Sequence, residues 1–147
     1  METVTVRGNN SFLKIALVEV FDFPERTSPF GGYDVEGNLE VESGGFKVKD
    51  KFFFTTSDLY KFYNQLKPAY KKINGEASFS CYDKNLKFNV IFQADGSVII
   101  SGAFNKTLRN SENSLEFKFS SDQTYLKQTL VELEAIVNKY GNEKGVL

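Results

Sequence analysis

The chain contains no histidine and no tryptophan, and it has one cysteine among its 147 residues. Without histidine, neither the Ser-His and Cys-His pairs that activate nucleophiles nor the usual catalytic zinc sites can form. Cys81 cannot form an intrachain disulfide, and its position on the strand face of Ala77 and Phe79 predicts a buried, inert thiol. We therefore expect no enzymatic activity, no metal and no other cofactor.

Long apolar runs are missing too. The longest, such as Ile15 to Val18, fall far short of the roughly 20 residues that cross a bilayer. The first residues, Met1 to Arg7, do not resemble a signal peptide, which needs a basic start and an uninterrupted apolar stretch. The sequence predicts a cytoplasmic protein without a membrane span.

Aromatic residues, by contrast, are abundant, with 15 Phe and 7 Tyr. Burial of such side chains contributes roughly 1.5 to 3 kcal/mol each, so a chain of this length can form one stable hydrophobic core. We expect a single domain, residues 1–147, in which 141–147 form a frayed tail.

The two charge signs are separated along the sequence although the net charge is only -1. Residues 1–45 hold eight acids and three bases, whereas 46–72 hold seven lysines and two acids. A two-residue hairpin at Gly44-Gly45 would place Glu42 opposite Lys47 and Glu40 opposite Lys49. Most of the opposing charges then pair within the fold. On the same strand face, however, Asp34 and Glu36 stay unpaired.

A nucleic-acid surface is not indicated. The basic and aromatic residues around the second strand of this hairpin interleave, but Phe46, Phe52 and Phe54 fall on the face opposite the lysines, where bases could not stack. The chain also has only three arginines. Core packing explains the aromatic positions better.

Alternating apolar residues and turn signals predict strands joined by hairpins, interrupted once by a helix and closed by another. Pro68 predicts a kink or an early end of the first helix near Lys67. Asp95-Gly96 predicts a two-residue hairpin that sets Phe92 opposite Ile99. Besides the strand after Gly44-Gly45, the expected strands are 3–6, 12–23, 33–42, 75–82, 86–94, 97–105 and 114–120, with a polar connection over 106–113 and a closing helix from Asp122 to Tyr140.

This order predicts the α+β class. We expect an antiparallel, largely meander sheet of about six to eight strands with two helices packed on one face, in the order β(β)ββ-α-ββββ-α. Both strand-to-helix junctions, at 52–60 and 117–126, end in Ser/Thr/Asp clusters. Such side chains cap helices, so we interpret Asp58 and Asp122 as caps and not as catalytic groups.

The chain resembles the WapI family of bacterial immunity proteins, small cytosolic partners that neutralise toxins used in contact-dependent competition between cells. The resemblance covers most of the chain and lies in fold-defining segments: Phe12 to Pro24, Tyr33-Asp34, Gly44-Gly-Phe46, Ser57-Asp-Leu59, Gly75 to Phe79 and Leu126 to Tyr140. It implies a non-enzymatic protein that binds a cognate toxin domain stoichiometrically, as a monomer or weak homodimer.

A protein partner would need an exposed patch rather than a reactive centre. Five residues, none of them taken from the family, form our candidate partner-binding site: Asp22, Glu25, Phe30, Asp34 and Glu36. With Glu19, the four acids could also form a catalytic carboxylate pair near the 24–32 loop, but solvated strand carboxylates are the commoner arrangement. The alternative function is a small-molecule or carbohydrate-binding module, with a deep pocket beside Tyr60, Tyr63 or Tyr125.

Overall fold

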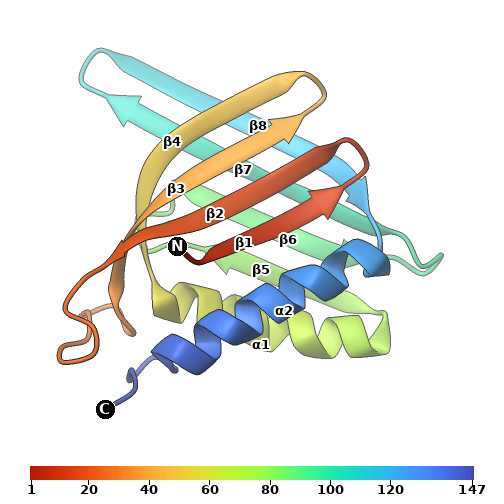
Figure 1. Cartoon of the computed structure of the whole chain (residues 1–147). Coiled ribbons are helices and arrows are strands. Elements are labelled where there is room, and N and C mark those ends of the chain that lie inside the picture. Colours follow the sequence, from red (N-terminus) through yellow and green to blue (C-terminus); the bar gives the residue numbers. More distant parts are fainter.

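The computed structural model describes the whole chain, Met1 to Leu147, as two successive ββββα units (Figure 1). Each unit contributes a separate antiparallel sheet, with strand orders β1-β2-β3-β4 and β5-β6-β7-β8. The elements are β1 (Thr3–Gly8), β2 (Ser11–Val20), β3 (Asp34–Ser43), β4 (Phe46–Thr55), α1 (Thr56–Lys72), β5 (Gly75–Ser80), β6 (Leu86–Phe92), β7 (Val98–Leu108), β8 (Ser111–Ser121) and α2 (Gln123–Tyr140). The predicted class and element order are confirmed, with the strands divided between two sheets of four.

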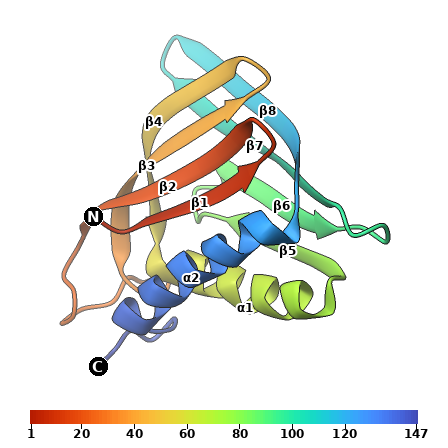
Figure 2. The ribbon, with the colours of Figure 1, turned by 45° about the vertical axis from the view of Figure 1, so that its right-hand side comes forward.

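The two sheets face each other across one hydrophobic core of 32 buried residues. The helices lie side by side at one end of this arrangement, below the sheets in Figure 2. Aromatic rings from both sheets and from α1 meet inside, among them Phe54, Phe62 and Phe79. The apolar faces expected from strand alternation are thus buried against each other, and the helices run along the sheet edges instead of covering one sheet face.

Each helix packs against the first strand of the other unit. α1 follows β4 but contacts β5, and α2 follows β8 but contacts β1. The same bond recurs in both places: Gln65 Oε1 accepts from the Ser78 amide at 2.9 Å, and Glu132 Oε1 accepts from the Thr5 amide at 3.0 Å. Both acceptors lie nine residues after the first residue of their helix. The repeated junction seen in the sequence is therefore part of a repeated structural unit.

Both helices begin at the predicted Ser/Thr/Asp clusters. Thr55 is the N-cap of α1 and exchanges two hydrogen bonds with Asp58, from the Thr55 amide to Oδ2 (2.9 Å) and from the Asp58 amide to Oγ1 (3.2 Å). Asp122 Oδ1 accepts from the Thr124 amide at 2.8 Å at the start of α2. The expected capping roles of Asp58 and Asp122 are confirmed. Burial raises the pKa of the Asp58 carboxyl despite these bonds.

The hairpin predictions gave two different outcomes. At Gly44-Gly45 the register is as expected, with Glu42 opposite Lys47 and Glu40 opposite Lys49. The register expected at Asp95-Gly96 is wrong by one residue, because Phe92 lies opposite Val98. Here the loop has three residues between Gln93 and Ser97, and Gly96 occupies the left-handed region at its end with φ 87°. A three-residue loop of this kind shifts every pair of the hairpin.

Two expected boundaries are also wrong. The first helix does not end near Lys67 but continues through Pro68 to Lys72, because Leu66 and Ala69 on either side of the proline are buried in the core. The polar segment 106–113 is not a loop: it extends β7 and β8 into a hairpin that turns at Arg109. These residues are polar because both faces of the projecting hairpin are exposed, and not because the strands end there.

The segment 141–147, which we expected to fray, folds back on the β2–β3 loop. The Val146 amide donates to the Tyr33 hydroxyl at 3.0 Å, and the Gly32 amide donates to the Glu143 carbonyl at 2.7 Å. Tyr33 itself is fully buried and donates to the carbonyl of Pro24. One tyrosine thus connects the C-terminal segment to the loop.

Glu2 joins β1 to the end of α2, and this contact gives a pH prediction. Its carboxylate lies 2.8 Å from both Lys139 Nζ and the Tyr140 hydroxyl, and the lysine hydrogen bond is the main cause that lowers the pKa of Glu2. A lowered carboxyl pKa stabilises the fold above the unfolded value of about 4.3, and this stabilisation is lost as the pH falls through the folded value. We expect Glu2→Gln to lower the free energy of unfolding by about 0.5 kcal/mol at pH 7, because the Glu2–Lys139 pair is partly exposed. At pH 3 the decrease should be smaller. Urea denaturation at both pH values measures this, and an equal loss at the two would contradict it.

Candidate functional site

The five predicted site residues lie in the β2–β3 loop and at the start of β3. Asp34 and Glu36 are on β3, with their side chains on the outer face of the first sheet. Asp22 and Asp34 line a surface depression of about 310 Å³ together with Arg26. Glu25 is exposed in the same loop. Asp22 and Asp34 thus line the same depression, whereas Glu36 extends the acidic surface along β3.

Asp22 is less available than a free carboxylate because it is paired. Its backbone adopts a left-handed conformation with φ 57°, and its Oδ2 lies 3.1 Å from Arg26 Nη2. The Asp22 carbonyl also accepts a hydrogen bond from the Arg26 amide at 2.9 Å. This residue therefore shapes the turn after β2 and carries a partly compensated charge.

Phe30 stacks on a tyrosine from the second unit. Its ring lies 4.6 Å from that of Tyr82, with an interplanar angle of 3°, yet Phe30 stays 59% exposed. Tyr82 precedes β6 in the β5–β6 turn, so the stack connects the β2–β3 loop to the second sheet. Burial raises the pKa of the Tyr82 hydroxyl, and the nearby charges of Asp83 and Asp34 raise it further. The aromatic pair therefore lies beside the acidic start of β3.

On the outer face of the first sheet, the charges are balanced at one end. Glu40 lies between Lys14 of β2 and Lys49 of β4. Glu42 faces Lys47, with 3.8 Å between Nζ and Oε1. This end shows the pairing of opposite charges that the sequence predicted, which is typical of a solvated sheet face.

The other end of the same face is not balanced. Glu36 lies between Glu19 of β2 and Phe53 of β4. Asp34 follows, and its carbonyl accepts a hydrogen bond from the Phe21 amide at 2.9 Å. None of the three carboxylates forms a salt bridge within 4.0 Å. The unpaired state predicted for Asp34 and Glu36 is therefore observed, and Glu19 joins them.

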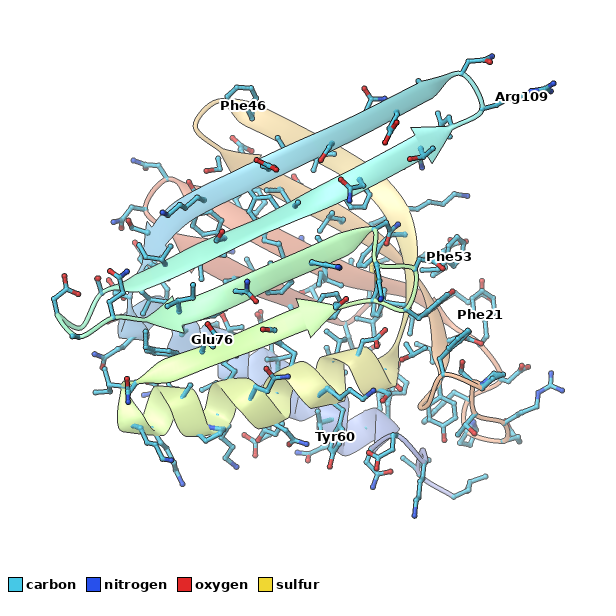
Figure 3. The ribbon with its side chains drawn as sticks, turned by 180° about the vertical axis from the view of Figure 1, so that it is seen from behind. Phe21, Phe46, Phe53, Tyr60, Glu76 and Arg109 are labelled. Carbon is cyan, nitrogen blue, oxygen red and sulfur yellow. The ribbon has the colours of Figure 1, made fainter.

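Apolar side chains lie among these acids. Val18, Phe21 and Phe53 are 39%, 36% and 38% exposed, and Figure 3 shows Phe21 and Phe53 projecting from the same edge of the molecule. We call this surface the carboxylate–phenyl patch and define it as Val18, Glu19, Phe21, Asp34, Glu36 and Phe53. The sequence offered one signal for Phe53, because the Gly44-Gly45 register places it opposite Glu36.

A protein-family model described as the immunity protein WapI-like family matches residues 5–141. The chain belongs to this family. The matched residues run from β1 to the glycine that follows α2, so the family covers the two sheets, both helices and the carboxylate–phenyl patch. No curated protein matches the chain.

The main surface depressions of the WapI-like fold do not involve the tyrosines expected beside a ligand pocket. Of seven surface depressions, the five main ones have volumes of about 200 to 530 Å³, and one of these lies at the β2–β3 loop while the others lie along the sheets. None of these five is lined by Tyr60, Tyr63 or Tyr125. No group of three or more His, Cys, Asp or Glu side chains is arranged to hold a metal ion. Neither helix is long and apolar enough to cross a membrane.

Cys81 is buried, as predicted for the WapI-like chain from its sequence. Its Sγ donates to Asn85 Oδ1 at 2.8 Å, and burial raises the pKa of the thiol. Because the thiolate is the nucleophilic form of cysteine, this residue is held in its unreactive form. Its role is in the packing of the β5–β6 turn.

Proposed function

We propose that the chain is a cytoplasmic immunity protein that binds and neutralises a cognate bacterial toxin domain, and that it does so without catalysing a reaction. Membership of the WapI-like family over residues 5–141 carries this proposal. The toxin belongs, on this proposal, to a system of contact-dependent inhibition between bacterial cells.

The structure supports inhibition by surface contact. A stoichiometric inhibitor needs a rigid scaffold and an exposed patch that excludes water at its centre, with no reactive group. The core here is filled by side chains, and the aromatic and acidic residues of the candidate site lie on strands and on a loop held by Tyr33. Binding would block the toxin by covering the surface with which it acts.

The proposal predicts that the reading frame immediately upstream of this gene encodes a toxin domain, and that domain is the partner used in the test. Cells that express this domain alone should stop growing, and coexpression of the immunity protein should restore growth. The purified proteins should form a complex of defined stoichiometry in size-exclusion chromatography with light scattering. The same measurement on the free chain tests whether it is a monomer or a weak homodimer. The proposal would be contradicted if coexpression gave no protection and the purified proteins formed no complex.

A further inference from the structure

We propose that the carboxylate–phenyl patch is the surface that docks the toxin, and that the toxin surface it receives is basic, with Arg or Lys side chains facing Glu19, Glu36 and Phe53. This inference rests on the proposed function, because it assumes a protein partner. It names the face, which family membership does not provide.

The first argument is the uneven charge pattern of one sheet face. If the outer face of the first sheet served the fold alone, opposite charges would be expected along its whole length, as they are around Glu40 and Glu42. Instead Glu19 and Glu36 lie directly opposite each other on neighbouring strands. Like charges in this position destabilise a sheet. The patch therefore carries a destabilising pair that a basic partner would neutralise.

The second argument is the β-bulge in β2. Leu17 pairs with Gly37 and Glu19 pairs with Glu36, so Val18 is the extra residue. Without the bulge, strand alternation would turn Glu19 toward the core. The bulge directs both Val18 and Glu19 outward and returns Val20 to the core side. Bulges often re-aim side chains next to functional sites, and this one creates the acidic pair.

The third argument is the chemistry of the exposed rings. Phe53 lies beside Glu36 across β3 and β4, and Phe21 flanks Asp34 on the other side. A guanidinium group can stack on a phenyl face while it donates to a neighbouring carboxylate. Apolar residues surrounded by charges are also the usual composition of an interface centre and its rim. A basic protein surface fits this arrangement better than an apolar or an acidic one.

Glu19→Lys is the most informative variant because its effects on folding and on binding should differ in sign. It replaces the like-charge pair with an opposite pair, so the urea midpoint of unfolding should rise. Affinity for the upstream toxin domain should nevertheless fall about tenfold or more, as expected when a central interface charge is reversed. Glu116→Lys, on the outer face of the second sheet, is the control and should leave affinity unchanged. A urea midpoint at or above that of the wild type would show that a loss of binding by Glu19→Lys is not caused by unfolding.

Phe53→Ala tests the apolar part of the patch, with Phe46→Ala as its matched control. Phe46 is on the same strand and is 68% exposed, but it lies at the far hairpin end from Phe53 (Figure 3). Isothermal titration calorimetry with the toxin domain should show about a tenfold loss of affinity for Phe53→Ala and no loss of affinity for Phe46→Ala. Raising the salt concentration should weaken the wild type more than it weakens Glu19→Lys.

The outcomes separate the two proposals. If the wild type neither binds nor protects, the proposed function is wrong. If the wild type binds while Glu19→Lys and Phe53→Ala bind equally well, the function stands and the docking face is wrong. If Glu19→Lys loses affinity but binding of the wild type does not depend on salt, the basic character of the toxin surface is contradicted.

Discussion

Truncation of Phe79 to alanine is expected to lower the free energy of unfolding by about 3 to 5 kcal/mol, the usual range for a buried phenylalanine. The ring is fully buried and is stacked on Phe88, with 5.3 Å between centroids. It also makes edge contacts with Phe62 of α1 at 6.3 Å and Phe54 of β4 at 6.4 Å. The lost side chain would leave a cavity where both sheets and one helix meet. A loss of this size is a large part of the stability of a domain of this length.

Urea denaturation followed by far-UV circular dichroism measures this effect, since the chain has no tryptophan for fluorescence. Phe46→Ala is the control, because its ring is mostly exposed and its removal should change the free energy of unfolding by less than about 0.5 kcal/mol. Similar midpoints for Phe79→Ala and the wild type would show that the core does not depend on the aromatic contacts between the sheets.

Gly8→Ala is expected to destabilise the fold by about 3 kcal/mol, the upper end for overpacking, although it adds only a methyl group. Gly8 ends β1 where this strand meets the end of β8. A Cβ atom there would overlap the backbone carbonyl of Ser120 and would lie 2.5 Å from the Phe119 ring. The same carbonyl accepts a hydrogen bond from the Asn9 amide at 3.0 Å, so it cannot move away without losing this bond. The contact between the two sheets would have to open.

Gly44→Ala is the appropriate comparison for this variant. Gly44 has φ 59°, which disfavours alanine, but a Cβ atom there would meet nothing within 4 Å. Gly44→Ala should therefore lower stability only by the cost of placing alanine in a left-handed backbone conformation, roughly 1 to 2 kcal/mol. Thermal unfolding of both variants measures the difference. If Gly8→Ala were the milder of the two, the close approach of β1 and β8 would be wrong.

Local turn chemistry accounts for the parts of the fold that the sequence predicted well. Gly44 and Gly45 both have positive φ, so the two-residue hairpin and its register followed directly. Asp95-Gly96 looked equivalent, but only Gly96 has positive φ, and the loop has three residues. The dipeptide alone does not distinguish these loops. Pro68 failed as a helix end for a different reason, because burial on both sides outweighed a local preference.

The division into two sheets could not be predicted from local patterns. Within each unit every strand pairs with its neighbours in sequence, and a single meander would differ from two packed sheets only in whether β4 and β5 also pair across α1. The difference lies in long-range contacts, such as the hydrogen bond from Thr129 Oγ1 to the Thr5 carbonyl at 2.7 Å. These depend on how the units pack, which alternation of apolar residues does not encode.

The candidate site shows the same limit. Strand alternation correctly placed Asp34 and Glu36 on the outer face, and the hairpin register could have added Phe53. The outward direction of Glu19 needs the bulge at Val18, which has no glycine or proline to mark it. The stacking partner of Phe30 is 52 residues away in the sequence and comes from the other unit.

Because each helix packs against the first strand of the other unit, the first sheet stays uncovered at one edge during synthesis of the protein. The first sheet is complete once β4 has left the ribosome, but the edge of β1 stays open until α2, which ends at Tyr140, has emerged. At roughly 5 to 20 residues per second, this interval lasts on the order of ten seconds. An open strand edge can pair with other chains during that time. The first half of the chain therefore depends on the last helix, α2, to cover the edge of β1.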